Sequence, residues 1–493
     1  MKIGVGENGS LFSRAGKALA WSFIGTAVSK FSTLAIGVVL ARVLGPHEFG
    51  TFAVATVALL ALLSFNELGV SLAIVRWPGD PREIVPTVST ISVAASTFIC
   101  AVCYVGAPAF ATAMGAPDAA PVVRVLGLSV IVSGIAAAPA AMLQRGFRQD
   151  RKTIADQISA WTSALVSVAL ALSGVGAMSL AVGQLVGSAV GAALFIAFAP
   201  RSLRFGFDRA KARALLKFGL PLAGSSIVVF ASTNVDKVLV GAVLGPVPLG
   251  FYVLAANLSN WPATMFSLPV RSVAPALLSR LQDDPPTMRK TFLSTGGLLA
   301  AITLPACVVL AAAADPIIAF VYGTAWQPAA TVLTWLGLLA ALRILFELVY
   351  DYFVVLAHSR VVFTVQVIWF VALVPALWAG AHYGGAAAAA LAAFAVAALV
   401  VAPIYLYELS RTGITTSAVA RRLGPAALGS LGAAAVAATA SRLISADLLA
   451  ILVSGLAAAA VLGLLLYRMR DTVKSLRSVG ATADEAAAPV VIA

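Results

Sequence analysis

The chain has 493 residues, of which 61% are hydrophobic and only 11% are charged, and its formal net charge is +13. A soluble domain carries about a quarter charged residues, so this composition excludes a soluble globular protein. The basic excess does not indicate nucleic-acid binding, because the lysines and arginines lie in the breaks between apolar blocks, where membrane proteins carry them.

Apolar blocks of roughly 20 residues or more follow one another along the chain, and each is long enough to cross ~30 Å of hydrocarbon as a helix. The blocks are apolar all round, unlike the alternating strands of a membrane barrel. We therefore predict an all-α polytopic membrane protein with about 14 transmembrane helices, and we interpret the first block as a helix, not a cleaved signal peptide. The predicted spans cover residues 17–41, 49–75, 85–109, 121–143, 154–174, 177–199, 216–243, 248–272, 292–314, 328–356, 361–380, 384–407, 424–443 and 448–467.

Two divisions between spans are short glycine-rich breaks, at residues 173–176 and 380–385. Glycine clusters of this kind are typical of tight turns. We expect each break to reverse the chain between antiparallel helices.

The positions of lysine and arginine predict the orientation of the spans. The N-terminal segment, the breaks after even-numbered spans and the C-terminal tail hold 27 of the 33 basic residues. The breaks after odd-numbered spans hold only Arg42, Arg124 and Arg442. The positive-inside rule therefore predicts that both termini are cytoplasmic and that the span count is even.

An internal repeat connects segments that lie 200 residues apart. Residues 43–55 read VLGPHEFGTFAVA, and residues 243–255 read VLGPVPLGFYVLA. Glycine ends one helix and proline cannot continue it, so each copy predicts a tight turn. Six spans separate the copies, so both have the same orientation in the membrane.

The repeat predicts two parallel six-helix lobes that face each other across an aqueous cleft, followed by a C-terminal helix pair. We place the lobes at residues 1–200 and 218–410, with a basic cytoplasmic linker at 201–217. Accessory helices 13 and 14 occupy residues 411–467, and a cytoplasmic tail occupies 468–493.

Three further segments accompany this topology. They are LARVLGPHEFG at residues 40–50, LGV at residues 68–70 with Arg76-Trp77 after it, and NVDK at residues 234–237 ahead of the second copy. With these segments the chain resembles the bacterial polysaccharide transporters, the Wzx-type oligosaccharide flippases of the multidrug/oligosaccharidyl-lipid/polysaccharide exporter superfamily. The likeness extends over essentially the whole chain.

The resemblance implies alternating access between two lobes, with no enzymatic activity and no cofactor. The implied substrate is an oligosaccharide on a polyprenyl diphosphate, taken up at the cytoplasmic face of the bacterial cytoplasmic membrane. It would be released outside, where a polysaccharide polymerase or glycosyltransferases would use it for cell-surface polysaccharide biosynthesis.

Charged residues inside spans are candidate functional residues, because each costs about 2.5–3.5 kcal/mol at mid-bilayer on insertion scales. Lys30 in span 1 is too central to snorkel easily and is a candidate counter-charge for the diphosphate. In span 7, Asp236 and Lys237 are neighbours and cannot pair directly. Lys237 is a candidate substrate contact, and Asp236 a candidate for proton coupling or for pairing with Lys30, with a structural polar lock between helices as the open alternative.

A polar stripe follows one face of span 10. Arg343 and Glu347 are four residues apart and can pair, and Asp351 continues the face. The stripe either lines the cleft, with Arg343 at the substrate, or forms an internally neutralised helix contact. Glu67 in span 2 is a further candidate for coupling or for contact between the lobes.

Residues at span ends are weaker candidates. Arg42, Arg76 and Arg271 are candidate contacts for the substrate headgroup, although basic residues are ordinary at a membrane interface. The tryptophans near span ends, Trp369 among them, are interpreted as an aromatic belt ahead of sugar stacking.

Other motifs carry little chemistry. Cys100-x-x-Cys103 has no second Cys/His pair, so we interpret its cysteines as packing residues and expect no metal site. The chain has no G-x-x-x-x-G-K-[ST] sequence, which argues against ATP hydrolysis.

Two alternatives compete with the flippase. An ion-coupled drug or metabolite exporter of the same superfamily would carry more acidic intramembrane residues, whereas Lys30, Lys237 and Arg343 favour an anionic substrate. A membrane glycosyltransferase or polymerase needs a sizeable extramembrane domain with catalytic carboxylates. Here Asp283-Asp284 lies in a short break, and no outer loop is large.

Overall fold

The structure is a computed structural model that describes residues 8–66, 70–200, 202–267, 275 and 277–470, with side chains from residue 35 onward except at 65, 66, 266 and 267. Its regular elements are helices, which confirms the predicted all-α fold. They are α1 (Asn8–Asn66), α2 (Val70–Arg76), η1 (Pro81–Glu83), α3 (Val85–Ala113), η2 (Pro117–Ala119), α4 (Ala120–Arg145), α5 (Gln149–Leu172), α6 (Met178–Phe198), α7 (Arg209–Leu244), α8 (Pro246–Ser259), η3 (Ala263–Ser267), α10 (Pro285–Ala312), α11 (Ala314–Tyr322), η4 (Thr324–Trp326), α12 (Pro328–Val355), α13 (Ser359–Val396), η5 (Ala397–Val401), α14 (Ala402–Arg411), α15 (Thr416–Leu443) and α16 (Asp447–Arg468).

Eleven helices within the described residues are long and apolar enough to cross a membrane. Two of these contain a non-helical glycine, Gly45 in α1 (φ 72°, ψ 175°) and Gly385 in α13 (φ 72°, ψ −162°). The chain folds back at Gly385. A Cβ on Gly380 would lie 2.6 Å from the carbonyl oxygen of Ala388, whereas eight residues of straight helix would separate these two positions by about 12 Å. When α1 and α13 are each divided at their non-helical glycine, and α8 is counted as the start of a further span, the structure is consistent with fourteen spans.

The two copies of the repeat have the same backbone conformation. Gly45 has φ 72° and ψ 175°, and Gly245 has φ 82° and ψ −169°. Glycine reaches a positive φ at no steric cost, and the proline that follows can only begin the next helix. The predicted tight turn is therefore confirmed at both copies, as is the turn at residues 173–176, where Gly174 and Gly176 also have positive φ.

Breaks after odd-numbered spans gather at one end of the molecule, which we call the turn end (residues 45–50, 114–117, 173–177, 245–250 and 313–327). The Glu48 carboxylate accepts a hydrogen bond from the Ala177 amide at 2.7 Å. A Cβ on Gly115 would lie 3.3 Å from the Cα of Gly245.

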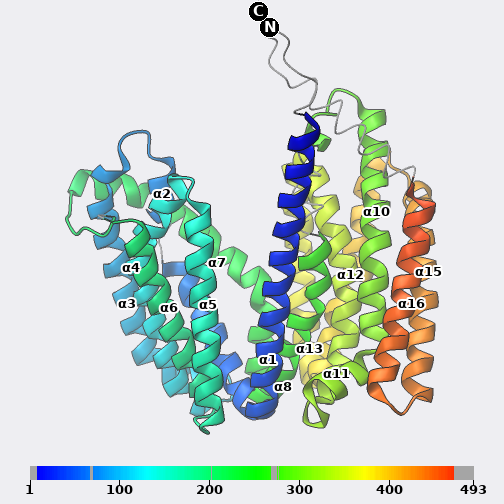
Figure 1. Ribbon diagram of the computed structural model, residues 1–493, viewed down its shortest axis with the longest axis horizontal. Coiled ribbons are helices and arrows are strands. Elements are labelled where there is room, and N and C mark those ends of the chain that lie inside the picture. The colour runs from blue at the N-terminus through cyan, green and yellow to red at the C-terminus, as the bar shows by residue number, and fades with distance from the viewer. Residues whose placement is uncertain (1–7, 67–69, 201, 268–274, 276, 471–493) are drawn as a thin grey trace, which may run out of the picture.

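Breaks after even-numbered spans gather at the other end, the basic end (residues 76–84, 145–149 and 202–209). The Arg145 guanidinium donates to the carbonyls of Ile74 at 2.7 Å, Trp77 at 2.8 Å and Gly79 at 3.0 Å. The Thr90 hydroxyl donates to the Gly206 carbonyl at 3.0 Å. This separation of the two groups of breaks matches the predicted alternation of spans, and Figure 1 shows α1 beginning and α16 ending at the same edge.

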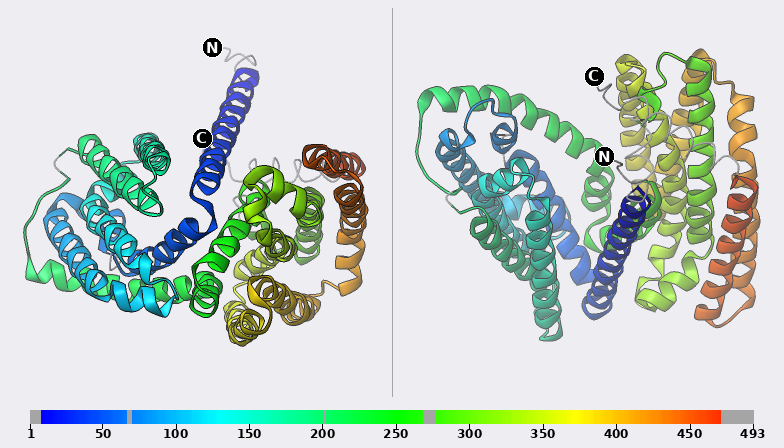
Figure 2. Two further views of the ribbon diagram at one scale, coloured as in Figure 1. Left: turned by 90° about the horizontal axis from the view of Figure 1, so that it is seen from below. Right: turned by 45° about the horizontal axis from the view of Figure 1, so that its top comes forward.

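The helices form two bodies, joined by α7, which runs from one to the other (Figures 1 and 2). Leu215 near the start of α7 is buried among residues of the first body, including Ile74 and Val88. Val240 near its end is buried in the large cluster of the second body, which reaches back to Ala41 in α1. Residues 202–208 precede α7 as a non-helical segment, and Asp208 caps the helix by accepting from the amides of Ala210 and Lys211.

Small residues bring α5 and α6 together in the first body. Glycines recur every four residues on α6, and they face serines that recur every four residues on α5. A Cβ on Gly187 would lie 2.6 Å from the Cβ of Ser163, and the Ser159 hydroxyl donates to the Gly187 carbonyl at 2.7 Å. Close approach of this kind drives helix association in lipid, where the hydrophobic effect between helices is lacking. The full set is Gly183, Gly187 and Gly191 against Ser167, Ser163 and Ser159.

Candidate functional site

The second body contains a cavity of about 310 Å³ between α7, α8, α12, α13 and α14. Polar and aromatic side chains share its wall with a few aliphatic ones. The lining residues are Ser232, Thr233, Val235, Asp236, Tyr252, Leu339, Arg343, Phe346, Glu347, Tyr350, Gln366, Trp369, Phe370, Leu373, Ala393 and Tyr405. We call this the second-body cavity.

One face of α12 supplies the charged part of the wall. Arg343, Glu347 and Tyr350 follow Leu339 at spacings of four, eight and eleven residues. Residues three, four or seven apart lie on one side of a helix, so the spacing alone aligns these side chains. The opposite side of α12 carries Ala341 and Leu348, which are buried in the apolar core.

One face of α13 supplies the facing part of the wall. The cavity is lined by Gln366 and by the residues three, four and seven positions after it, which are Trp369, Phe370 and Leu373. Residues at these spacings lie on one side of a helix. Trp369 packs edge to face with Phe346 of α12, with ring centroids 5.9 Å apart and an interplanar angle of 88°. The aromatic-belt interpretation is therefore wrong for Trp369, because α13 turns this ring toward α12 and into the cavity.

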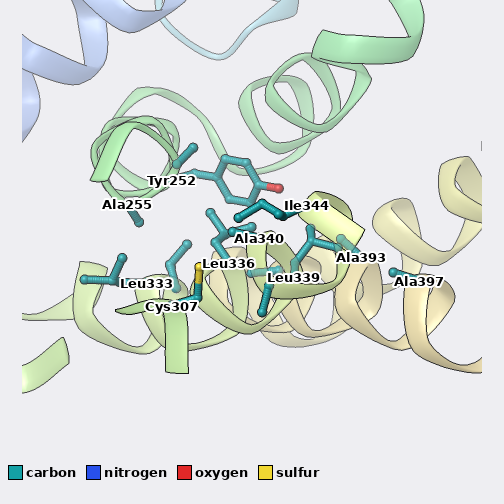
Figure 3. Packing of buried hydrophobic residues seen from close by; sticks show 14 of the residues in the cluster. Tyr252, Ala255, Cys307, Leu333, Leu336, Leu339, Ala340, Ile344, Ala393 and Ala397 are labelled. Carbon is teal, nitrogen blue, oxygen red and sulfur yellow. The ribbon is translucent and has the colours of Figure 1, made fainter. Parts of the chain in front are cut away.

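Asp236 is held by hydrogen bonds at the α7 side. The Tyr252 hydroxyl donates to Asp236 Oδ2 at 3.2 Å, and the amide of Lys237 donates to Oδ1 at 2.8 Å. The Lys237 ammonium donates instead to Asn234 Oδ1 at 2.8 Å, so the neighbouring charges do not pair through their side chains. In Figure 3 the Tyr252 ring lies over the buried core, with its hydroxyl directed away from Ala255.

The described part of the cavity wall contains more acid than base. Among the lining residues that the structure describes, Arg343 is the one lysine or arginine, whereas Asp236 and Glu347 both contribute carboxylates. A guanidinium beside carboxylates is largely neutralised. Arg343, which the sequence suggested either as a substrate contact or as part of an internally neutralised helix contact, therefore shares the cavity with two carboxylates.

The two bodies meet at the turn end through the repeat itself. A Cβ on Gly250 would lie 3.1 Å from the Cα of Gly50 and 3.2 Å from the carbonyl oxygen of Pro46. A Cβ on Gly50 would lie 2.6 Å from the carbonyl carbon of Pro246. Each copy thus places its glycine against the other copy's turn, an arrangement typical of a two-fold related pair.

A second contact at the turn end joins α1 to the α11–η4 connection. The Arg42 guanidinium donates to the carbonyls of Phe320 and, at 2.7 Å, Val321, near the end of α11. The indole of Trp326, which is 1% exposed, donates to the Ala41 carbonyl at 3.2 Å. A helix C-terminus carries partial negative charge, which favours the Arg42 cation there.

The predicted site residues thus fall into three groups. Asp236, Arg343 and Glu347 line the second-body cavity, with Lys237 beside Asp236 and half-buried Asp351 one turn beyond Glu347 on α12. Arg42 lies at the turn end, and Arg76 is the exposed last residue of α2 at the basic end. Glu67, Arg271 and the side chain of Lys30 lie outside the described residues.

Several lining residues did not stand out in the sequence. Tyr350, Gln366, Trp369 and Tyr405 are aromatic or uncharged polar residues in long apolar stretches. The one feature of the sequence that could have indicated them is their helical spacing relative to Arg343 and Glu347 or to one another. Tyr252 lies within the second copy of the repeat, and its place there was a usable signal.

The cysteines are packing residues, as interpreted. Cys100 and Cys103 are buried, and a Cβ on Gly127 of α4 would lie 3.2 Å from the Cys103 sulfur. Within the described part of the chain, no group of three or more His, Cys, Asp or Glu side chains is arranged to hold a metal ion.

Comparison with known proteins adds to this geometry. A family model described as polysaccharide biosynthesis protein matches residues 39–331. The chain is similar to the lipopolysaccharide biosynthesis protein WzxC of Escherichia coli (strain K12), with 24% identity over 368 residues, 74% of this chain and 75% of that protein. It is also similar to the succinoglycan biosynthesis transport protein ExoT of Rhizobium meliloti (strain 1021), with 28% identity over 327 residues, 65% of each chain.

Solved structures share the fold. The structure of the lipid II flippase MurJ in an inward closed conformation aligns with a TM-score of 0.72 at 16% identity, covering 91% of this chain and 100% of that one. An inward-facing multidrug resistance transporter of the MATE family aligns with a TM-score of 0.60 at 16% identity, covering 78% of this chain and 95% of that one. At these identities the likeness establishes the fold.

Proposed function

Because the chain belongs to the polysaccharide biosynthesis protein family, we propose that it flips an oligosaccharide linked to a polyprenyl diphosphate from the cytoplasmic to the outer leaflet of a membrane. It acts as a multi-pass transporter and not as an enzyme, and it serves the biosynthesis of cell-surface polysaccharide. Transport proceeds by alternating access between the two helical bodies.

The observation that carries this proposal is the family match over a fold of two bodies that meet at one end. The names of the relatives point to lipopolysaccharide and succinoglycan biosynthesis, and one of them is named a transport protein. A lipid II flippase has the same fold. The partners that fit this role are a polysaccharide polymerase or glycosyltransferases that use the flipped glycan.

The turn end is the closed gate of the conformation described. The contacts of Gly50 with Pro246, of Arg42 with Val321 and of Trp326 with Ala41 all join the two halves of the chain there. Opening also separates the apolar residues that pack around the two glycines, among them the edge-to-face pair of Phe49 and Trp326. Opening the turn end and closing the basic end would expose the substrate to the other side.

The basic end is the cytoplasmic one in this proposal, and the membrane is the bacterial cytoplasmic membrane. Arg145, Arg148 and Arg209 belong to connections that share this end, and cytoplasmic loops carry such an excess. Both termini then lie in the cytoplasm, because an even number of spans places them on the same side as the basic end.

Lys30, Arg76, Lys237 and Arg271 are the proposed contacts for the diphosphate, as cations that can meet an anionic headgroup. Arg42 has a different proposed role, because its guanidinium already bonds the end of α11 and stabilises the closed gate. Glu67, Asp236, Glu347 and Asp351 remain candidates for coupling or for contact between the bodies.

The experiment is deletion of the gene followed by mass spectrometry of polyprenyl-linked sugars. We expect one lipid-linked oligosaccharide to accumulate and the corresponding surface glycan to be lost, with both restored by the gene on a plasmid. Unchanged levels of every lipid-linked intermediate, together with intact surface glycans, would refute the proposal.

A further inference from the structure

We propose that the second-body cavity binds one sugar ring of the transported glycan and not its diphosphate; this inference rests on the proposed function. The described residues that line the cavity come from α7, α8, α12, α13 and α14. They differ from the residues that make the gate contacts at the turn end, such as Gly50, Arg42 and Trp326.

Aromatic rings make up a large part of the cavity wall. Trp369 and Phe370 come from α13, Phe346 and Tyr350 from α12, and Tyr405 from α14. Phe346 holds both Trp369 (centroids 5.9 Å apart) and Tyr405 (5.3 Å), so these rings are fixed against one another. Sugar rings present weakly positive C–H groups that pack against the negative faces of such rings.

Hydrogen-bonding groups of both kinds stand between the rings. The Arg343 guanidinium only donates, the Asp236 and Glu347 carboxylates only accept, and the Gln366 amide does both. A sugar hydroxyl also donates and accepts, so one ring can satisfy donors and acceptors together. The polar groups of the wall thus match a polyhydroxylated ligand.

A diphosphate suits this wall poorly. Its oxygens only accept, so the donors of Arg343 and Gln366 could serve it while Asp236 and Glu347 would face it with like charge. Like charges at close range in a membrane interior repel strongly. The charge balance therefore excludes the diphosphate from the cavity and directs it to the basic residues elsewhere.

The size of the cavity also fits part of a glycan. Its volume of about 310 Å³ lies at the low end of the roughly 300–1,000 Å³ range of small-molecule pockets. A single ring, with the rest of the glycan and its lipid outside, fills the space available.

The test compares two probes on the full chain in lipid nanodiscs by native mass spectrometry. One probe is polyprenyl diphosphate without sugar, and the other is the polyprenyl-diphosphate-linked oligosaccharide extracted from cells that lack the protein. We expect Trp369→Leu and Gln366→Leu to weaken binding of the glycosylated probe about 10-fold or more, and to leave binding of the sugarless probe unchanged. Trp378→Leu is the matched control, because Trp378 lies on the same helix, is 48% exposed and is absent from the cavity wall.

Retained binding of the sugarless probe shows that each variant is folded, and Trp369→Phe keeps a ring at the position and should restore much of the affinity. Equal weakening of both probes would place the diphosphate in the cavity and overturn the inference. Unchanged binding of both, while the wild type still prefers the glycosylated probe, would overturn the inference and leave the proposed function standing. Failure of the wild type to bind either probe would count against the proposed function itself.

Discussion

Gly50 and Gly250, which occupy the same position in the two copies of the repeat, lie against each other where the two bodies meet. A Cβ on Gly250 would lie 3.1 Å from the Cα of Gly50. The two backbones approach this closely only because both positions lack a side chain. The repeat therefore does more than make two similar turns, since it also makes the contact between them.

A side chain at Gly50 should prevent this contact. A Cβ there would meet the Pro246 carbonyl, whose carbon would be 2.6 Å away, and backbone cannot yield as a flexible side chain can. Gly50→Val should therefore abolish complementation of a deletion strain while the protein remains in the membrane, as measured by surface glycan and by immunoblot. Gly37→Val in the part of α1 before Gly45 is the control, because a Cβ at Gly37 meets nothing within 4 Å. Full activity of Gly50→Val would show that the bodies need not meet here.

Loss of the Arg42 guanidinium should loosen the closed gate. Its hydrogen bonds to the carbonyls of Phe320 and Val321 are charge-assisted but exposed, so we expect an effect of about 1 kcal/mol, or several-fold in the open population. The measurement is labelling of Ala41→Cys, a position that is 0% exposed, by an impermeant maleimide. The native cysteines are replaced first.

Arg42→Ala should increase labelling of Ala41→Cys several-fold. The control is Arg124→Ala, because Arg124 bonds the Tyr104 carbonyl at 3.2 Å within the first body and does not link the two. Equal labelling of the Arg42→Ala variant and its parent would remove Arg42 from the gate.

Overpacking at Gly187 should separate α5 from α6. A Cβ there would lie 2.6 Å from that of Ser163, so Gly187→Leu should destabilise the first body by about 1–3 kcal/mol. The Tm of the purified protein, measured by tryptophan fluorescence in detergent, should fall clearly. Gly455→Leu on α16, where a Cβ would meet nothing within 4 Å, should leave it unchanged. A Tm equal to that of the wild type would mean that the two helices do not pack through these glycines.

Sided labelling should distinguish the two ends of the molecule. Phe147 at the basic end is 95% exposed, and Leu443 at the end of α15 is 85% exposed. In intact cells, an impermeant maleimide should label Leu443→Cys at once and Phe147→Cys only after permeabilisation, because the basic end faces the cytoplasm. The opposite pattern would reverse the proposed orientation.

Most of the fold could be predicted from the sequence, because a bilayer imposes simple rules. Every span must be long, apolar and helical, and basic residues collect on one side. The breaks at Gly45, Gly245 and Gly385 were predictable for the same reason, since glycine and proline interrupt otherwise continuous apolar blocks. Residues 209–217, which we assigned to the basic linker, are helical and form the first turns of α7.

The site could be predicted only in its charged part. Asp236, Arg343 and Glu347 stood out because a charge within an apolar span is costly and rare. Trp369 did not stand out in this way. The composition of a span does not show whether its tryptophan faces lipid, a neighbouring helix or a cavity. The side on which α13 packs against α12 decides between these, and that depends on contacts between helices far apart in the sequence.

The most direct measurement of the central claim uses proteoliposomes that contain the purified chain and the lipid-linked oligosaccharide from the deletion strain. Membrane-impermeant periodate oxidises only those sugars that are exposed on the outer leaflet. If the chain is a flippase, the lipid-linked oligosaccharide that is initially protected in the inner leaflet should become oxidised over time. In proteoliposomes with the Gly50→Val variant, this inner-leaflet fraction should stay protected. A protected fraction that persists equally with the wild-type chain, with the variant and with empty liposomes would contradict the account.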